Sequence, residues 1–148
     1  MIQIGTDAPL FMADSTHGTF QLADYAGKRP IVLIFYPMDN TPGCTKQLCA
    51  VRDSKVAYAK FDAVVVGINP ASVESHQGFA DKHQYNFPIL SDRDESIRKM
   101  YGITKFLFLM QQRVVIVVGK NGQIIFAEKG LRPTEEILAV LATDAGSA

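Results

Sequence analysis

The sequence of 148 residues predicts a three-layer α/β sandwich around a mixed central β-sheet. Two continuous apolar segments, 31–36 and 63–68, are rich in β-branched residues, as strands buried on both faces are. Amphipathic segments of helical length follow each of them, and this alternation requires right-handed βαβ crossovers. The pair Asn121-Gly122 between two later apolar segments predicts an antiparallel hairpin, which makes the sheet mixed.

The individual elements follow from periodicity and capping signals. Strands are predicted at 31–36, 63–68, 87–90, 113–118 and 124–126, after an N-terminal hairpin within 10–22 that turns at 14–18. Helices are predicted at 44–61, at 72–85 with Ser72 as N-cap, from Ser91 to about Gly102, and at 133–141. Residues 143–148 are expected to be frayed.

The composition excludes several classes of protein. Fifteen Lys and Arg balance fifteen Asp and Glu, which argues against nucleic acid or an anionic membrane surface as the partner. The length predicts one domain over residues 1–148. No segment has the pattern of a signal peptide, and the apolar segments are too short to span a bilayer, so a cytoplasmic location is expected.

The chain has only two cysteines, Cys44 and Cys49. Two are too few for a disulfide scaffold, and a cytosolic pair is more often redox-active or metal-binding than structural. A zinc site needs a second pair of Cys or His ligands at short spacing, which the three histidines do not provide. We therefore expect no metal. The C-x-x-C pattern of dithiol oxidoreductases is absent as well.

Cys44 stands where an α/β fold places its reactive groups. Residues 37–45 follow the strand at 31–36, and sites form beyond the carboxyl ends of such strands. The turn signal Pro42-Gly43 puts Cys44 in the first turn of the next helix. Unpaired N–H groups and the positive end of the helix dipole favour a thiolate there, so Cys44 is predicted to be a nucleophile.

The spacing of the two cysteines limits how they can bond. In an ideal helix, five residues separate two Cα atoms by roughly 8.6 Å, whereas a disulfide requires less than about 7 Å. Two possibilities remain open: Cys44 and Cys49 never bond, or they bond only when the helix locally unfolds.

Several segments resemble one protein family. Residues 37–44, Pro-Met-Asp-Asn-Thr-Pro-Gly-Cys, resemble the P-x-x-x-T-x-x-C signature of peroxiredoxins. Residues 45–53 resemble the Q-type, or bacterioferritin-comigratory, subgroup, in which a second cysteine follows five positions later. The resemblance covers about residues 3–142. It implies a thioredoxin-like fold and an atypical two-cysteine peroxidase that reduces hydrogen peroxide or organic hydroperoxides with a thiol.

The resemblance also implies roles for individual residues. Cys44 matches the peroxidatic cysteine and Cys49 the resolving one, which implies a redox disulfide between Cys44 and Cys49. Thr41 matches the hydroxyl that contacts peroxide and thiolate, Pro37 the residue that shields the site, and Arg113 the strand arginine that faces the thiolate. The implied substrate-binding residues are Thr41, Gly43, Cys44 and Arg113.

The resemblance implies no metal, haem, flavin or nicotinamide cofactor. The implied partners are a peroxide and a thioredoxin-like protein reductant, and the chain is expected to be a monomer or a weak homodimer. Two other functions stay open on the residues alone. One is a protein dithiol oxidoreductase or peroxide-responsive redox sensor, and the other is a non-catalytic binding module.

Two features have more than one interpretation. Gln47, one turn after Cys44, is either part of the site or only a surface polar group. The apolar residues 106–110 are an extension of a core strand, a contact surface for a second subunit, or an apolar wall near the site.

Overall fold

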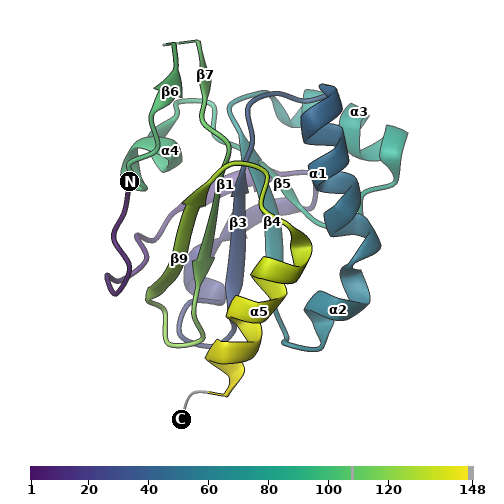
Figure 1. Ribbon diagram of the computed structural model, residues 1–148. Helices are drawn as coiled ribbons and strands as arrows, with labels where there is room; N and C mark the ends of the chain where they lie inside the picture. Colours follow the sequence, from purple (N-terminus) through teal and green to yellow (C-terminus); the bar gives the residue numbers. More distant parts are fainter. Residues whose placement is uncertain (108, 147–148) are drawn as a thin grey trace.

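A computed structural model describes residues 1–107 and 109–146. A seven-stranded mixed sheet forms its centre, in the order β2-β1-β5-β4-β3-β8-β9 (Figure 1). The pairs β3–β4 and β4–β5 are parallel and the remaining neighbours are antiparallel. The strands are β1 Met12–Ser15, β2 Gly18–Gln21, β3 Ile31–Phe35, β4 Val64–Asn69, β5 Ile89–Ser91, β8 Val114–Val118 and β9 Ile124–Lys129.

Successive residues of a strand are buried on opposite faces of the sheet. In β3, Val32 and Ile34 lie in one apolar cluster, whereas Ile31, Leu33 and Phe35 lie in another. Residues of α1, α2, α3 and α5 cover the first face, and α4 with the N-terminal segment covers the second. The predicted three-layer architecture is thus confirmed. The helices are α1 Pro42–Asp53, α2 Lys55–Ala59, α3 Val73–His83, α4 Ser96–Met100, α5 Thr134–Ala145 and the 3₁₀ turn η1 Leu22–Asp24.

Local sequence signals correctly identified one helix N-cap and one hairpin turn. Ser72 caps α3, since its hydroxyl accepts a hydrogen bond from the backbone N–H of Ser75 at 3.1 Å. Gly122 has a φ of 86° in the turn between β8 and β9, a conformation that favours glycine. The N-terminal hairpin is also present, as β1 and β2.

Three helix boundaries differ from the prediction. The helix expected at 44–61 starts at Pro42 and is broken at Ser54, which separates α1 from α2. The short helix starts at Ser96 rather than Ser91, because the Asp92 carboxylate accepts the N–H groups of Ile97 and Arg98. Helix α5 continues to Ala145, so residues 143–145 are helical rather than frayed, and 147–148 lie outside the described residues.

The described residues of the apolar segment 106–110, which are Phe106, Leu107, Leu109 and Met110, form no core strand. They belong to a separate two-stranded hairpin of β6 (Lys105–Phe106) and β7 (Met110–Gln111), which projects from the molecule at the upper left of Figure 1. Phe106, Leu107 and Leu109 are exposed by 57%, 69% and 78%. The interpretation as an extension of a core strand is therefore wrong, and Phe108 lies outside the described residues.

Within the ranges that the structure describes, none of the helices combines the length and the apolar character needed to cross a bilayer.

Replacing Leu33 by Ala tests the central packing. Leu33 is fully buried in β3, and truncating such a side chain removes apolar contacts and leaves a cavity. We expect a loss of about 2–5 kcal/mol in the free energy of unfolding, measured by urea titration. Val56→Ala is the control, because Val56 is 74% exposed, and it should change stability by no more than about 0.5 kcal/mol. Similar losses in the two variants would contradict the assigned core.

Candidate active site

Cys44 lies in the first turn of α1, directly after the loop that leaves β3. It is the third residue of the helix, is fully buried, and is a free thiol. The loop starts at the carboxyl end of β3, between β4 and β8, as the sequence predicted. The fold therefore places one buried sulfur atom at the positive end of a twelve-residue helix.

Arg113 faces this sulfur from the strand side. It immediately precedes β8, which pairs with β3, and its Nη2 donates a hydrogen bond to Cys44 Sγ at 3.4 Å. The guanidinium carries a permanent positive charge, so the fold places a fixed cation beside the sulfur. A Cβ added at Gly43 would lie 3.1 Å from Arg113 Nη2, so a side chain there would press on the guanidinium. The predicted pairing of Cys44 and Arg113 is thus present in the structure.

Gln47 holds the same guanidinium from the next helical turn. Its side-chain oxygen accepts a hydrogen bond from Arg113 Nη1 at 2.6 Å. Gln47 is only 5% exposed, so its interpretation as a surface polar group is wrong. Sγ of Cys44 and Oε1 of Gln47 occupy two different nitrogens of Arg113, which fixes the orientation of the guanidinium plane.

Thr41 is the N-cap of α1, but its side chain caps no N–H group. The hydroxyl instead donates to the carbonyl of Met38 at 3.2 Å. The first N–H groups of a helix have no intrahelical acceptor, and none of the residues in this turn is acidic. The contact of Thr41 with thiolate and peroxide therefore stays a prediction that requires its hydroxyl to turn away from Met38.

Two buried amides hold the start of the loop. Asn69, at the end of β4, donates to the carbonyls of Tyr36 and Pro37, both at 2.9 Å. Gln111, at the end of β7, donates to the carbonyls of Tyr36 at 2.7 Å and Ile68 at 2.8 Å. Pro37 is half-buried and anchored through its own carbonyl. Its shielding of the site stays a prediction.

A buried carboxylate holds the middle of the loop. Asp39 accepts hydrogen bonds from the hydroxyls of Tyr36 and Ser75, and its Oδ2 lies 2.7 Å from Nδ1 of His76, which is fully buried. Burial alone would raise the pKa of Asp39, but the hydrogen bonds from His76, Tyr36 and Ser75 outweigh it and lower this pKa. The loop before Cys44 is thereby tied to α3.

Cys49 lies further along the same helix and is partly exposed, also as a free thiol. Its Sγ is 3.5 Å from the hydroxyl oxygen of Tyr85, a buried residue that follows α3. Both cysteines belong to one unbroken helix, so the geometric argument against a bridge applies to this state. Their predicted disulfide requires at least the turns between them to unwind.

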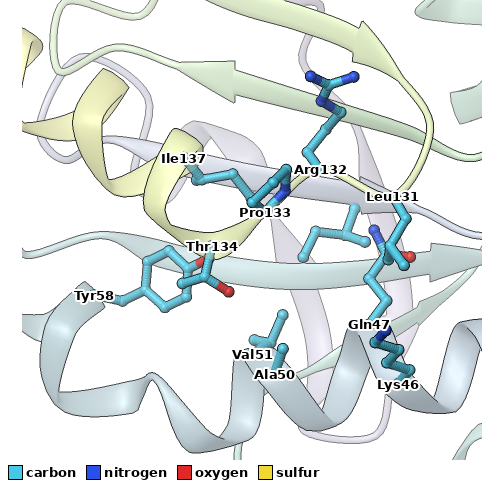
Figure 2. Close-up of a pocket in the computed structure, with 11 residues that line it drawn as sticks. Lys46, Gln47, Ala50, Val51, Tyr58, Leu131, Arg132, Pro133, Thr134 and Ile137 are labelled. Carbon is cyan, nitrogen blue, oxygen red and sulfur yellow. The ribbon is translucent and has the colours of Figure 1, made fainter.

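A cavity of about 320 Å³ lies between α1 and the start of α5 (Figure 2). Gln47 reaches toward Leu131 in its wall, and Val51, Tyr58 and Ile137 supply most of the apolar lining. The cavity meets the site at Gln47 rather than at Cys44. The cavity therefore adjoins the site through Gln47, the side chain that orients the guanidinium of Arg113.

Sequence reasoning missed several residues around the cysteines. No sequence motif indicated the hydrogen-bond network of Asp39 with Tyr36, Ser75 and His76. Tyr85 is 36 positions from Cys49 in the sequence, so no local pattern indicated their contact. Within residues 1–107 and 109–146, no group of three or more His, Cys, Asp or Glu is arranged to hold a metal ion.

Comparisons with known proteins all lead to one family. The model of the AhpC/TSA family matches residues 4–127. Peroxiredoxin Bcp of Bacillus subtilis is 34% identical over 96% of this chain and 94% of its own length. The chloroplastic peroxiredoxin Q of Sedum lineare is 42% identical over 80% of this chain, which spans only 64% of that protein.

Solved structures agree with these relatives. Peroxidoxin BcpB from Mycobacterium tuberculosis has a TM-score of 0.87 at 25% identity and covers 97% of this chain, which covers 98% of it. A bacterioferritin comigratory protein of Xanthomonas campestris, described for its alkyl peroxide reduction activity, has a TM-score of 0.83 at 26% identity over 91% of this chain and 92% of its own. The expected thioredoxin-like fold is thus confirmed.

Replacing Asp39 by Asn tests the anchoring of the loop. The amide loses a charge-assisted acceptor, so we expect a loss of about 1.5–3 kcal/mol in unfolding free energy at pH 7. Because the pKa of Asp39 in the folded protein lies below the ordinary value of 3.8, the carboxylate stabilises the fold above that pH, and this contribution disappears as pH falls through the folded pKa. The difference between wild type and Asp39→Asn should therefore shrink below about pH 4 in urea titrations.

The control for this variant is Asp14→Asn, at an exposed position of β1. It should stay within about 0.5 kcal/mol of wild type. A stability difference for Asp39→Asn that is constant from pH 3 to pH 7 would rule out the assigned role of the carboxylate.

Proposed function

We propose, because the chain belongs to the AhpC/TSA family and to its peroxiredoxin Q (Bcp) group, that it is a thiol peroxidase whose reactive group is the thiolate of Cys44. The observation that carries this proposal is the contact between Arg113 Nη2 and Cys44 Sγ, at 3.4 Å, in the first turn of α1. A positive side chain and a helix N-terminus converge on one buried sulfur, and both favour its nucleophilic form.

The first step is attack of the Cys44 thiolate on one oxygen of the peroxide. A sulfur–oxygen bond forms while the oxygen–oxygen bond breaks, so that sulfur is oxidised by two electrons and the peroxide is reduced by two. The departing oxygen takes its bonding electron pair and a proton and leaves as water or an alcohol. The product on the protein is a sulfenic acid.

The charge that develops on the departing oxygen needs fixed donors. The guanidinium of Arg113 and the first N–H groups of α1 lie beside Cys44 and are held there before substrate arrives. Gly43 keeps the approach to the guanidinium open, and Thr41 offers a further hydroxyl once it releases Met38. This arrangement suits a small, polar O–O group better than a protein disulfide.

The second step is attack of Cys49 on the sulfenic sulfur. The sulfur–sulfur bond forms, the sulfur–oxygen bond breaks, and the oxygen leaves as water after taking a proton. Because Cys44 and Cys49 lie in one helix, α1 must unwind locally before this step. A thioredoxin-like protein then reduces the disulfide by thiol–disulfide exchange.

The remaining expectations form part of the same proposal. The substrates are hydrogen peroxide and/or organic hydroperoxides, the chain acts in the cytoplasm, and it is a monomer or a weak homodimer. The bacterial relative in Bacillus subtilis supports this location, although the plant relatives are described as chloroplastic.

Replacing Cys44 or Arg113 tests the proposal directly. Cys44→Ser should abolish peroxide consumption and leave no sulfenic acid in mass spectra after one equivalent of peroxide. Arg113→Lys should lower the rate constant for Cys44 oxidation by about 10²–10³-fold, because a point charge cannot reproduce the donors of the guanidinium. Stopped-flow competition measures this constant.

Arg29→Lys is the matched control for the arginine, since Arg29 forms an exposed pair with Asp62 away from Cys44. It should oxidise at the wild-type rate. If Cys44→Ser consumes peroxide as fast as wild type, the chain is no Cys44-dependent peroxidase.

Replacing Cys49 by Ser separates the two steps. The variant should still react once, at an unchanged rate, because the hydrogen bonds of the described residues join Cys44 to Arg113 and Cys49 to Tyr85 but not the two cysteines to each other. It should then accumulate sulfenic acid, which dimedone labelling and mass spectrometry detect. Undiminished turnover with a thioredoxin-like reductant would show that Cys49 is not the required resolving residue.

A further inference from the structure

Tyr85, which follows α3, contacts two residues in the part of α1 that must unwind, Thr45 and Cys49. Its hydroxyl oxygen lies 3.5 Å from Cys49 Sγ and 3.3 Å from the backbone carbonyl of Thr45. Thr45 follows Cys44 directly, so these two contacts hold the segment between the cysteines at both of its ends. The mechanism proposed above assigns no role to this residue.

The ring of Tyr85 is fixed independently of its hydroxyl. It packs edge-on against Phe79 with ring centroids 5.1 Å apart, lies parallel to His83 at 5.5 Å, and contacts Phe87 at 5.3 Å. Tyr85 is 8% exposed. The aromatic neighbours therefore hold the hydroxyl against α1 at little entropic cost on each closing of the helix.

The same segment also holds the far end of α1. Arg52 donates from Nη1 to the carbonyl of His83 at 2.6 Å, and Asn86 donates to the carbonyl of Arg52 at 3.4 Å. Residues 83–86 thus tie α1 at Arg52, where the helix remains folded, and at Thr45 and Cys49, where it must open. Of the contacts made by residues 83–86, only those of Tyr85 have to break for the cysteines to meet.

In the reduced protein, the Tyr85 hydroxyl and the Cys49 thiol together have enough hydrogen atoms for both contacts. The Tyr85 hydroxyl donates its single proton to the Thr45 carbonyl, and the thiol of Cys49 can donate to the hydroxyl oxygen. Burial, together with Cys49, raises the pKa of Tyr85, so the phenol keeps its proton.

We propose that Tyr85 is a positioning residue that holds the segment between Cys44 and Cys49 in its helical form, and that its hydroxyl thereby slows disulfide formation relative to further oxidation of the sulfenic acid. The inference rests on the proposed peroxidase function. Tyr85 touches neither Cys44 nor Arg113 through any hydrogen bond of the described residues, so the first oxidation does not depend on its hydroxyl.

The variant Tyr85→Phe tests this role, because it removes the hydroxyl and keeps the ring packed. Loss of two neutral hydrogen bonds should accelerate conversion of sulfenic acid to disulfide about five- to tenfold, followed by quenched flow with alkylation and mass spectrometry. The peroxide concentration that produces half-maximal sulfinic acid should rise by the same factor, a change that general loss of stability does not produce.

Tyr58→Phe is the matched control. Tyr58 is also buried and lies in the neighbouring helix α2, but its hydroxyl has no hydrogen-bond partner among the described residues. This variant should form the disulfide at the wild-type rate. Hydrogen exchange in the reduced proteins adds a readout without peroxide: amides in the first turns of α1 should exchange faster in Tyr85→Phe than in Tyr58→Phe.

The outcomes separate this inference from the proposed function. Normal formation of sulfenic acid with equal or slower disulfide formation in Tyr85→Phe would overturn the role of Tyr85 and leave the peroxidase intact. Equal exchange in the two variants would overturn it too. Failure of the wild type to oxidise Cys44 would instead refute the peroxidase, and the inference with it.

Discussion

The contact of Arg113 with Cys44 is the interaction on which the site depends, because it joins the sheet to the helix that carries the reactive sulfur. A partly buried guanidinium needs hydrogen-bond acceptors, because burial removes part of its solvation. Removing the partner of a buried charge destabilises a protein by about 3–5 kcal/mol. Gln47 and Cys44 satisfy two of its nitrogens, and Gly43 leaves space for it. The thiolate and the guanidinium therefore stabilise each other, and neither position is independent of the other.

The loop before α1 keeps Cys44 and Arg113 in position relative to each other. Asn69 and Gln111 hold its first carbonyls from two different strands, and Asp39 holds its middle through α3. None of these side chains contacts the sulfur through a hydrogen bond of the described residues, yet each fixes the backbone that places it. Donors that are already oriented need no reorganisation when charge moves onto the peroxide, which is why such anchoring favours catalysis.

The parts of the fold that could be predicted from sequence are those that local pattern determines. Long β-branched segments and the cap at Ser72 gave strands and a helix start within a few residues of the observed ones, because these signals act over one or two turns. The break at Ser54 has no Gly or Pro to mark it. The late start of α4 depends on Asp92, whose carboxylate reaches two N–H groups that could equally belong to a longer helix.

The residues of the site also fall into two groups, those that the sequence indicated and those that it did not. Cys44 and Arg113 could be named because the motif around the first is specific and the resemblance supplied the second. Gln47 could not be distinguished from a surface residue, since its partner is 66 positions away. The contact of Cys49 with Tyr85 spans 36 positions and likewise arises only when α1 packs on the segment after α3. Local pattern indicates reactive residues, whereas the residues that orient them come from tertiary packing.

In the proposed reaction, the contacts that build the site also oppose the second step. Every bond that keeps Cys44 buried in a folded α1 adds to the cost of unwinding it toward Cys49. Oxidation itself removes part of this cost. A thiolate attracts the guanidinium of Arg113 with a full negative charge, whereas a neutral sulfenic acid accepts the same hydrogen bond without that charge, so the contact weakens. The helix is thus held most firmly while the sulfur is reduced and loosens once it has reacted. The oxidation of Cys44 leaves the hydroxyl of Tyr85 unchanged, so its contacts still restrain the turns that must open, together with the bond between Arg113 and Gln47.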